Sequence, residues 1–250
     1  MYFETFGSET HINPYYSLAS NDFIGIHHFT HEGIPVDNEQ VKRFTKFMSS
    51  LHLDKISLQS YLDEGGDLLD SYSYLQRGNG EFNIITIPET IISCGSVKLM
   101  REFIYIEPEY INEIIGGHSI LSHSIRYGCY DITDLLLVHG ADPNTPGKRC
   151  KTSLYHAINQ ENLDIVKKLL DNGADPNMQY ASHGLNYLYT ALSRYVYYDY
   201  SDCDDDILNR KNIVKMLIKH GCECQPILYN SDILKAYVKI IAEMKENGEY

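Results

Sequence analysis

The sequence lacks any apolar run long enough to cross a membrane. A membrane-spanning helix needs about 20 consecutive apolar residues, and no segment approaches that length. The first residues, MYFETFGSETHINPYY, have neither a basic start nor an apolar centre, so we expect no secretory signal. The six cysteines are scattered, and a chain of 250 residues does not need a disulfide framework. We therefore expect a cytoplasmic protein without a membrane partner.

Positive charge is also scarce. The chain has 21 Lys and Arg against 34 Asp and Glu, which gives a formal net charge of −13. Binding to nucleic acid depends on basic side chains that displace counterions from phosphates, so we expect no nucleic-acid partner. A strong negative balance steers basic proteins towards a surface, although it serves plain solubility equally well.

Signals of catalysis are missing too. The chain has no glycine-rich phosphate loop and no nucleophile elbow. His27, His28 and His31 lie close together, but the surrounding pattern is typical of a strand and a turn, and a single glutamate is the only nearby carboxylate. We expect no metal site there. One alternative stays open, in which residues 1–85 hold a small metal-binding or catalytic element built on these histidines.

What the sequence does contain is a phrase that occurs twice. The first copy, HSILSHSIRYGCYDITDLLLVHGADPN, ends at Asn144, and the second, KTSLYHAINQENLDIVKKLLDNGADPN, ends at Asn177. The two Gly-Ala-Asp-Pro-Asn endings are 33 residues apart. This period predicts stacked repeats, each of two short antiparallel helices. A single pair cannot bury its apolar face, so neighbours must stack through leucines such as Leu136 and Leu169.

The same spacing locates further copies. Thr86 stands 33 residues before Ser119 and opens a segment with the same helix-turn-helix pattern. A fourth copy begins near Asn186 and is interrupted by SRYVYYDYSDCDDDILNRKN, residues 193–212. The halves of the other copies are separated by about six residues, far fewer than this insertion. The extra residues must therefore loop out or lengthen both helices.

The predicted organisation has an N-terminal extension, a run of repeats and a closing helix. Residues 38–70 echo the repeat only weakly, and residues 1–37 match nothing in it. The closing helix should have a polar outer side, because a terminal repeat needs one for solubility. The predicted boundaries are 1–37 for the extension, 38–225 for the repeats (38–70, 84–116, 117–147, 148–183, and 184–225 with the insertion 193–212) and 226–250 for the closing helix.

The two clear copies resemble the ankyrin repeat, whose phrase is roughly T-P-L-H-x-A-A-x-x-G-x-x-x-I-V-x-L-L-L-x-x-G-A-D-x-N. The matching positions are Ser119, Leu121, Gly128, Ile132, Leu136, Leu137, Gly140, Ala141, Asp142 and Asn144, then Thr152, Leu154, Ala157, Ile165, Val166, Leu169, Leu170, Gly173, Ala174, Asp175 and Asn177. Ser153 departs from the usual proline. The resemblance implies an all-α solenoid of about five stacked helix-turn-helix units. It also implies a non-catalytic protein-binding scaffold without a cofactor.

The cysteines do not alter this expectation. Cys203, Cys222 and Cys224, with His220, offer soft ligands for zinc, but the last two cysteines stand where Ala and Pro occur in the other copies. A structural role is the better interpretation. A nucleophile such as Cys94 would lack an oxyanion hole nearby. We expect neither a metal nor an enzyme activity.

Ankyrin repeats bind partners through turn tips and the inner-helix surface, and this implies a set of candidate residues. Any one of them is also compatible with a plain solvated surface. The tip candidates are Lys148, Arg149, Tyr180 and His183, and the inner-helix candidates are Arg126, Tyr127, Asn159, Gln160 and Arg194.

The stretch from Tyr180 to Asp206 is the most unusual part of the chain, with seven tyrosines followed by a run of aspartates. Tyrosine is enriched at binding hot spots, and carboxylates beside it attract a basic patch. The alternative is that some tyrosines pack inside the stack and the aspartates form a solvated loop. The candidates here are Tyr195, Tyr197, Tyr198, Asp202, Asp204 and Asp205.

These features predict a monomer that captures another protein, with a basic surface, on its concave face and at the insertion. The divergent repeats are similar to ankyrin proteins of poxviruses and intracellular bacteria that engage host factors. An acidic immunity protein that inhibits a basic toxin is the alternative setting.

Overall fold

The computed structural model describes residues 39, 42–43, 46–47, 57–69, 71–75, 82–180, 185–197, 204–224 and 231–249. The predicted extension at residues 1–37, which includes His27, His28 and His31, lies outside these ranges. Among the residues described, no helix combines the length and the apolar character that crossing a membrane requires. The chain divides into two compact bodies, residues 1–141 and 142–250, and each is described by itself.

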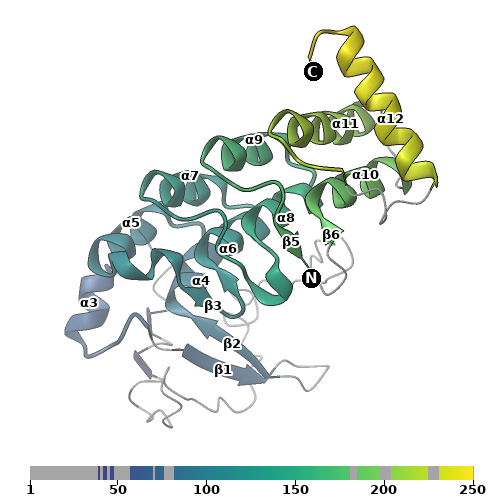
Figure 1. The fold of residues 1–250 in the computed structure, drawn as a ribbon. Coiled ribbons are helices and arrows are strands. Elements are labelled where there is room, and N and C mark those ends of the chain that lie inside the picture. The colour runs from purple at the N-terminus through teal and green to yellow at the C-terminus, as the bar shows by residue number, and fades with distance from the viewer. Residues whose placement is uncertain are drawn as a thin grey trace. The chain divides into compact units, whose positions relative to one another are not determined.

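The N-terminal body consists of helical hairpins and short strands (Figure 1). Its helices α4 and α5 form one hairpin, and α6 and α7 form the next. Helix α4 packs on α6, and α5 packs on α7. The elements are α3 (Leu58–Asp63), β1 (Ser71–Leu75), β2 (Phe82–Thr86), α4 (Ile87–Ser93), α5 (Val97–Ile106), the 3-10 helix η2 (Pro108–Asn112), β3 (Ile114–Ile115), β4 (His118–Ser119), α6 (Ile120–Arg126) and α7 (Tyr130–Val138).

The C-terminal body repeats the arrangement. Helices α8 and α10 pack side by side, α9 packs on α11, and α12 packs against α10 and α11 (Figure 1). The elements are the 3-10 helix η3 (Lys148–Cys150), α8 (Ser153–Asn159), α9 (Leu163–Asp171), β5 (Gln179–Tyr180), β6 (Leu185–Asn186), α10 (Tyr187–Tyr197), α11 (Asp204–Lys219) and α12 (Ser231–Glu246).

Hydroxyl side chains start the inner helices. Thr86 and Glu89 form a reciprocal capping box at the start of α4, and Ser119 Oγ accepts the backbone N–H of Ser122 at 3.1 Å. Thr152 stands at the same repeat position but makes no cap. Its hydroxyl instead lies 2.7 Å from the hydroxyl of Tyr187, and both residues are buried. The threonine thus links α8 to the next repeat.

Each Gly-Ala-Asp-Pro-Asn phrase forms a clasp to the following repeat. Asn144 donates to the carbonyl of Gly173 at 2.8 Å and accepts the N–H of Asp175 at 2.7 Å. Asn177 makes the same pair of bonds, at 2.9 Å to the carbonyl of Gly221 and 2.7 Å from the N–H of Glu223. These bonds satisfy backbone groups at the helix ends.

The repeats share one kind of core. Leu136, Leu169 and Leu217 occupy equivalent outer-helix positions, and each is fully buried. Ile125, Ala157 and Ala191 are buried on the inner helices. This pattern confirms the predicted stacking through outer-helix leucines, since each hairpin alone leaves that face uncovered.

Two features differ from the predicted all-helical plan. Short antiparallel pairs join the repeats: β1 with β2, β3 with β4, and β5 with β6. The strands β3, β4, β5 and β6 have two residues each, which is too short to leave a period-2 pattern in the sequence. The closing helix also differs, because α12 exposes Leu234 and Val238 on its outer side. Most other exposed residues of α12 are polar or charged, and only a narrow stripe (Ile233, Ile240, Met244) is buried.

Candidate protein-binding surface of the C-terminal body

The insertion of the fourth repeat lengthens both of its helices. Helix α10 has 11 residues against 7 in α8, and α11 has 16 against 9 in α9. The clasp bonds span the whole repeat, and they show an excess of 15 residues, because Asn177 reaches a glycine 44 positions ahead and Asn144 reaches one 29 positions ahead. We call residues 194–197 and 204–210 the α10–α11 extension. The connection, residues 198–203, lies outside the described residues.

A glutamate occupies the turn beneath this extension. Glu161 connects α8 to α9 with a φ of 55°, the left-handed region that disfavours residues with a β-carbon. Gly128 and Gly95 stand 33 and 66 residues earlier, at the equivalent turns, with φ of 70° and 69°. The two earlier repeats therefore have glycine at the turn position that requires a positive φ, whereas the α8–α9 turn has Glu161 there.

The Glu161 carboxylate binds two arginines from the extension. Arg194 Nε lies 2.9 Å from Oε1, and Arg210 Nε lies 2.8 Å from Oε2. Arg194 also donates through Nη1 to Asn159 Oδ1 at 3.0 Å, and the Asn209 amide donates to the Glu161 carbonyl. The Arg210 side chain is only 7% exposed. These contacts hold α10 and α11 against the α8–α9 turn.

Sequence reasoning missed Glu161, Asn209 and Arg210. The 33-residue register could have found the first of them, because it aligns Glu161 with two turn glycines. A charged residue at a turn position that is glycine in the other repeats suggests that its side chain makes a specific contact. The two others had no sequence signal, since their partner is 48 or 49 residues away.

The outer end of the extension combines apolar and acidic side chains. Tyr197 is 48% exposed and Leu208 is 53% exposed. Asp205 and Asp206 are exposed in the first turn of α11, where carboxylates are favoured by the positive end of the helix dipole. At residues 204–206 the acidic run is therefore helical, whereas the alternative interpretation had made it a loop.

The tyrosines between Tyr180 and Asp206 differ in how deeply they are buried. Tyr187 is fully buried, as the alternative interpretation expected for part of the set. Tyr189 and Tyr195 are half-buried on α10, and Tyr197 is exposed. Tyr198, Asp202 and the tip candidate His183 lie outside the described residues.

A basic tip lies at the other end of α8. Lys148 and Arg149 are exposed, and the Lys151 ammonium lies 4.5 Å from the centre of the Tyr155 ring. Arg149 and Cys150 both have positive φ, at 60° and 56°. Strand β5, which ends at Tyr180, contacts this tip.

The structure therefore separates the sequence candidates into two groups in the C-terminal body. Tip residues gather before α8, and the others gather at its far end, about 10 Å away by the rise of a helix of this length. Asn159 and Arg194 bond to each other, and Gln160 is half-buried beside them. Asp204 begins α11. Arg126 and Tyr127, at the end of α6, are half-buried and belong to the N-terminal body.

A buried contact between a histidine and a glutamate lies in the N-terminal body. His123 Nε2 donates to the carbonyl of Ile115 at 2.8 Å and lies 3.2 Å from Glu89 Oε1. Burial lowers the pKa of His123, and the opposing attraction to Glu89 does not overcome it. Gly116, with a φ of 58°, lies so close that a β-carbon would stand 2.8 Å from Glu89 Oε1. This pair braces the β3–β4 turn.

Two cysteines, Cys129 and Cys222, lack the character of nucleophiles. Burial raises the pKa of Cys129 to about 11 and that of Cys222 to about 12. Their thiols donate to the carbonyls of Ile92 and Pro176, each at 3.0 Å. Over the described ranges, no group of three or more His, Cys, Asp or Glu side chains could hold a metal ion. Cys203, one of the soft ligands considered above, is outside these ranges.

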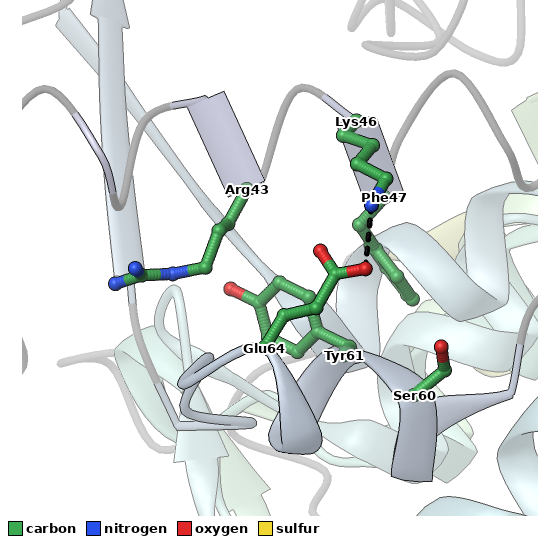
Figure 2. Close-up of a pocket in the computed structure, with 6 residues that line it drawn as sticks. All are labelled: Arg43, Lys46, Phe47, Ser60, Tyr61 and Glu64. Carbon is green, nitrogen blue, oxygen red and sulfur yellow. Dashed lines mark hydrogen bonds and ion pairs between the residues drawn. The ribbon is translucent and has the colours of Figure 1, made fainter.

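A small pocket lies beside α3 (Figure 2). The Phe47 and Tyr61 rings, 5.0 Å apart, form its floor, and Lys46 pairs with Glu64 across it. Its cavity volume of about 10 Å³ is far below the roughly 300 Å³ of typical small-molecule sites. The lining residues are Arg43, Lys46, Phe47, Ser60, Tyr61 and Glu64.

Comparison with known proteins agrees with this geometry. A family model of three ankyrin repeats matches residues 90–199. No curated protein matches the chain. Ankyrin repeats generally mediate binding between proteins and are typically non-catalytic. The doubled phrase, the stacked hairpins and the matched segment together show ankyrin repeats at residues 90–199 of this chain.

Proposed function

We propose that the protein captures a partner protein on its C-terminal body, with the outer end of the α10–α11 extension as the main contact. One observation carries the proposal: the described parts of the insertion, residues 193–197 and 204–212, are helical and expose Tyr197, Leu208, Asp205 and Asp206. An insertion that folds into an ordered surface with exposed apolar groups is typical of a recognition element.

The chemistry of this end favours a basic partner. Tyrosine contributes a large contact area at low entropic cost, and the neighbouring carboxylates complement Lys and Arg. The net charge of −13 adds long-range attraction for such a partner. The basic tip at Lys148 and Arg149 then contacts a different, acidic or neutral part of the same partner.

A binding measurement with matched variants tests the proposal. The partner is first recovered with the wild-type protein from the native cell and identified by mass spectrometry. We expect the combined change Tyr197→Ala, Asp205→Asn and Asp206→Asn to weaken its affinity by at least 30-fold, about 2 kcal/mol. Isothermal titration calorimetry measures this difference.

The control removes the same groups elsewhere. Tyr105, Asp131 and Asp164 are exposed on other helices. Changing them to Ala, Asn and Asn alters the net charge equally, and we expect less than a threefold effect. Equal losses in both variants, or no loss in the first, would remove the extension from the binding surface.

A further inference from the structure

The α8–α9 turn keeps a side chain that the repeat does not need. Glycine closes the equivalent turns at Gly95 and Gly128, and it adopts positive φ without strain. Glu161 holds the same conformation at a φ of 55°, which a residue with a β-carbon rarely adopts. The backbone alone therefore does not account for a glutamate there, so its side chain must supply the reason.

The side chain connects three elements. One carboxylate oxygen is bound by Arg194 of α10 and the other by Arg210 of α11, at 2.9 and 2.8 Å. The Glu161 carbonyl also accepts the Asn209 amide. The Arg194 contact is also a hydrogen bond, and such bonds between ionised groups with little exposure are stronger than surface ion pairs. The Arg210 contact is an ion pair by distance. No other described carboxylate bridges two helices of the extension to the preceding turn.

We propose that Glu161 is a positioning residue, which holds the α10–α11 extension in one orientation and so presents Tyr197 and Leu208 to the partner. This inference rests on the proposed function for its biological purpose. Its physical basis is preorganisation, because a surface that is ordered before binding loses less entropy when the partner docks.

The fold does not depend on this contact. The core of these repeats includes Leu169, Leu192, Val214 and Leu217, which are all fully buried. Replacing Glu161 by the glycine that the other turns use should therefore keep the hairpins intact. It removes the backbone strain and both arginine contacts of the extension, whereas the bond from Asn209 to the carbonyl of residue 161 remains.

Hydrogen exchange on the full chain tests the inference without a partner. For Glu161→Gly we expect amide protection in residues 194–197 and 204–210 to fall at least tenfold, while protection in residues 165–170 stays within twofold. The thermal midpoint should be unchanged or higher. Unchanged protection in the extension, or a uniform loss across the C-terminal body, would overturn the inference.

Two amide variants of Glu161 separate the effect of side-chain length from the effect of backbone strain. Glu161→Gln keeps the length of the side chain and one hydrogen-bond acceptor, whereas Glu161→Asn is one methylene shorter and tolerates positive φ better. We expect the Gln variant to retain at least threefold more protection in the extension than the Asn variant. The opposite order would show that backbone strain, rather than the side-chain contact, controls the extension.

The outcomes also distinguish this inference from the proposed function. A partner that binds Glu161→Gly as tightly as the wild type would overturn the positioning role and leave partner capture intact. Loss of protection in the extension, together with unchanged partner affinity in the Tyr197, Asp205 and Asp206 variant, would support the positioning of the extension and remove the proposed contact.

Discussion

At the scale of single residues, asparagine does more for this protein than its abundance in turns suggests. Asn144 and Asn177 each use both ends of one amide to bind the next repeat. An aspartate two positions earlier accepts the asparagine N–H, at 2.9 Å for Asn144 and 2.8 Å for Asn177, and fixes the turn. The amide is therefore held ready to bond across the repeat boundary.

Removing one clasp should weaken the C-terminal body. We expect Asn177→Ala to lower the free energy of unfolding by about 1–3 kcal/mol, because two hydrogen bonds to the turn at Gly221 are lost. Urea denaturation followed by circular dichroism measures the change. Asn172→Ala is the matched control, since the Asn172 amide bonds only to Lys168 in its own helix. An equal loss in both variants would contradict the role of the clasp.

At the scale of secondary-structure elements, α12 is held by charge as well as by its narrow apolar stripe. Lys211 pairs with Glu243, and Lys215 and Lys219 pair with Glu249 at 3.2 and 2.9 Å. Hydrogen bonds from Lys219, and then from Lys215, lower the pKa of Glu249 to about 2. Lys211 likewise lowers the pKa of Glu243.

This predicts acid-sensitive attachment of α12. The pKa of Glu249 is depressed on folding, so its contribution is present above the ordinary value of 4.5 and is lost as the pH falls towards 2. We expect amide protection in α12 to decrease between pH 4.5 and 3 while α9 stays protected. Hydrogen exchange at several pH values measures this, after correction for the intrinsic exchange rate. Glu249→Gln should flatten the response, and an unchanged response would rule out this carboxylate as its origin.

At the scale of the whole molecule, the charge balance should govern association. With a net charge of −13, the attraction to a basic partner is long-ranged and screened by salt. We expect the association rate constant to fall at least tenfold between 50 and 300 mM NaCl, with a smaller change in the dissociation rate constant. Surface plasmon resonance separates the two. Salt-insensitive association would argue against a basic partner, including the toxin of the immunity-protein interpretation.

The sequence predicted those features that depend on neighbours along the chain. The 33-residue period located the repeats, since stacked hairpins must place leucines such as Leu136 and Leu169 at equivalent positions. It also located the insertion at residues 193–212. The partner-binding role of individual residues stays a prediction, although their positions are known within the described ranges.

The sequence by itself therefore determined the repeat architecture, because helix caps, turn glycines and apolar periodicity act over a few residues. Only the tertiary structure decided which conformation and which contacts the insertion and its neighbouring residues adopt. It lengthened α10 and α11, buried Tyr187 and brought Arg194 and Arg210 onto Glu161, 33 and 49 residues away in sequence. Long-range ion pairs of this kind leave no periodic signal. They depend on where two separate hairpins place their side chains, and only the folded chain brings these together.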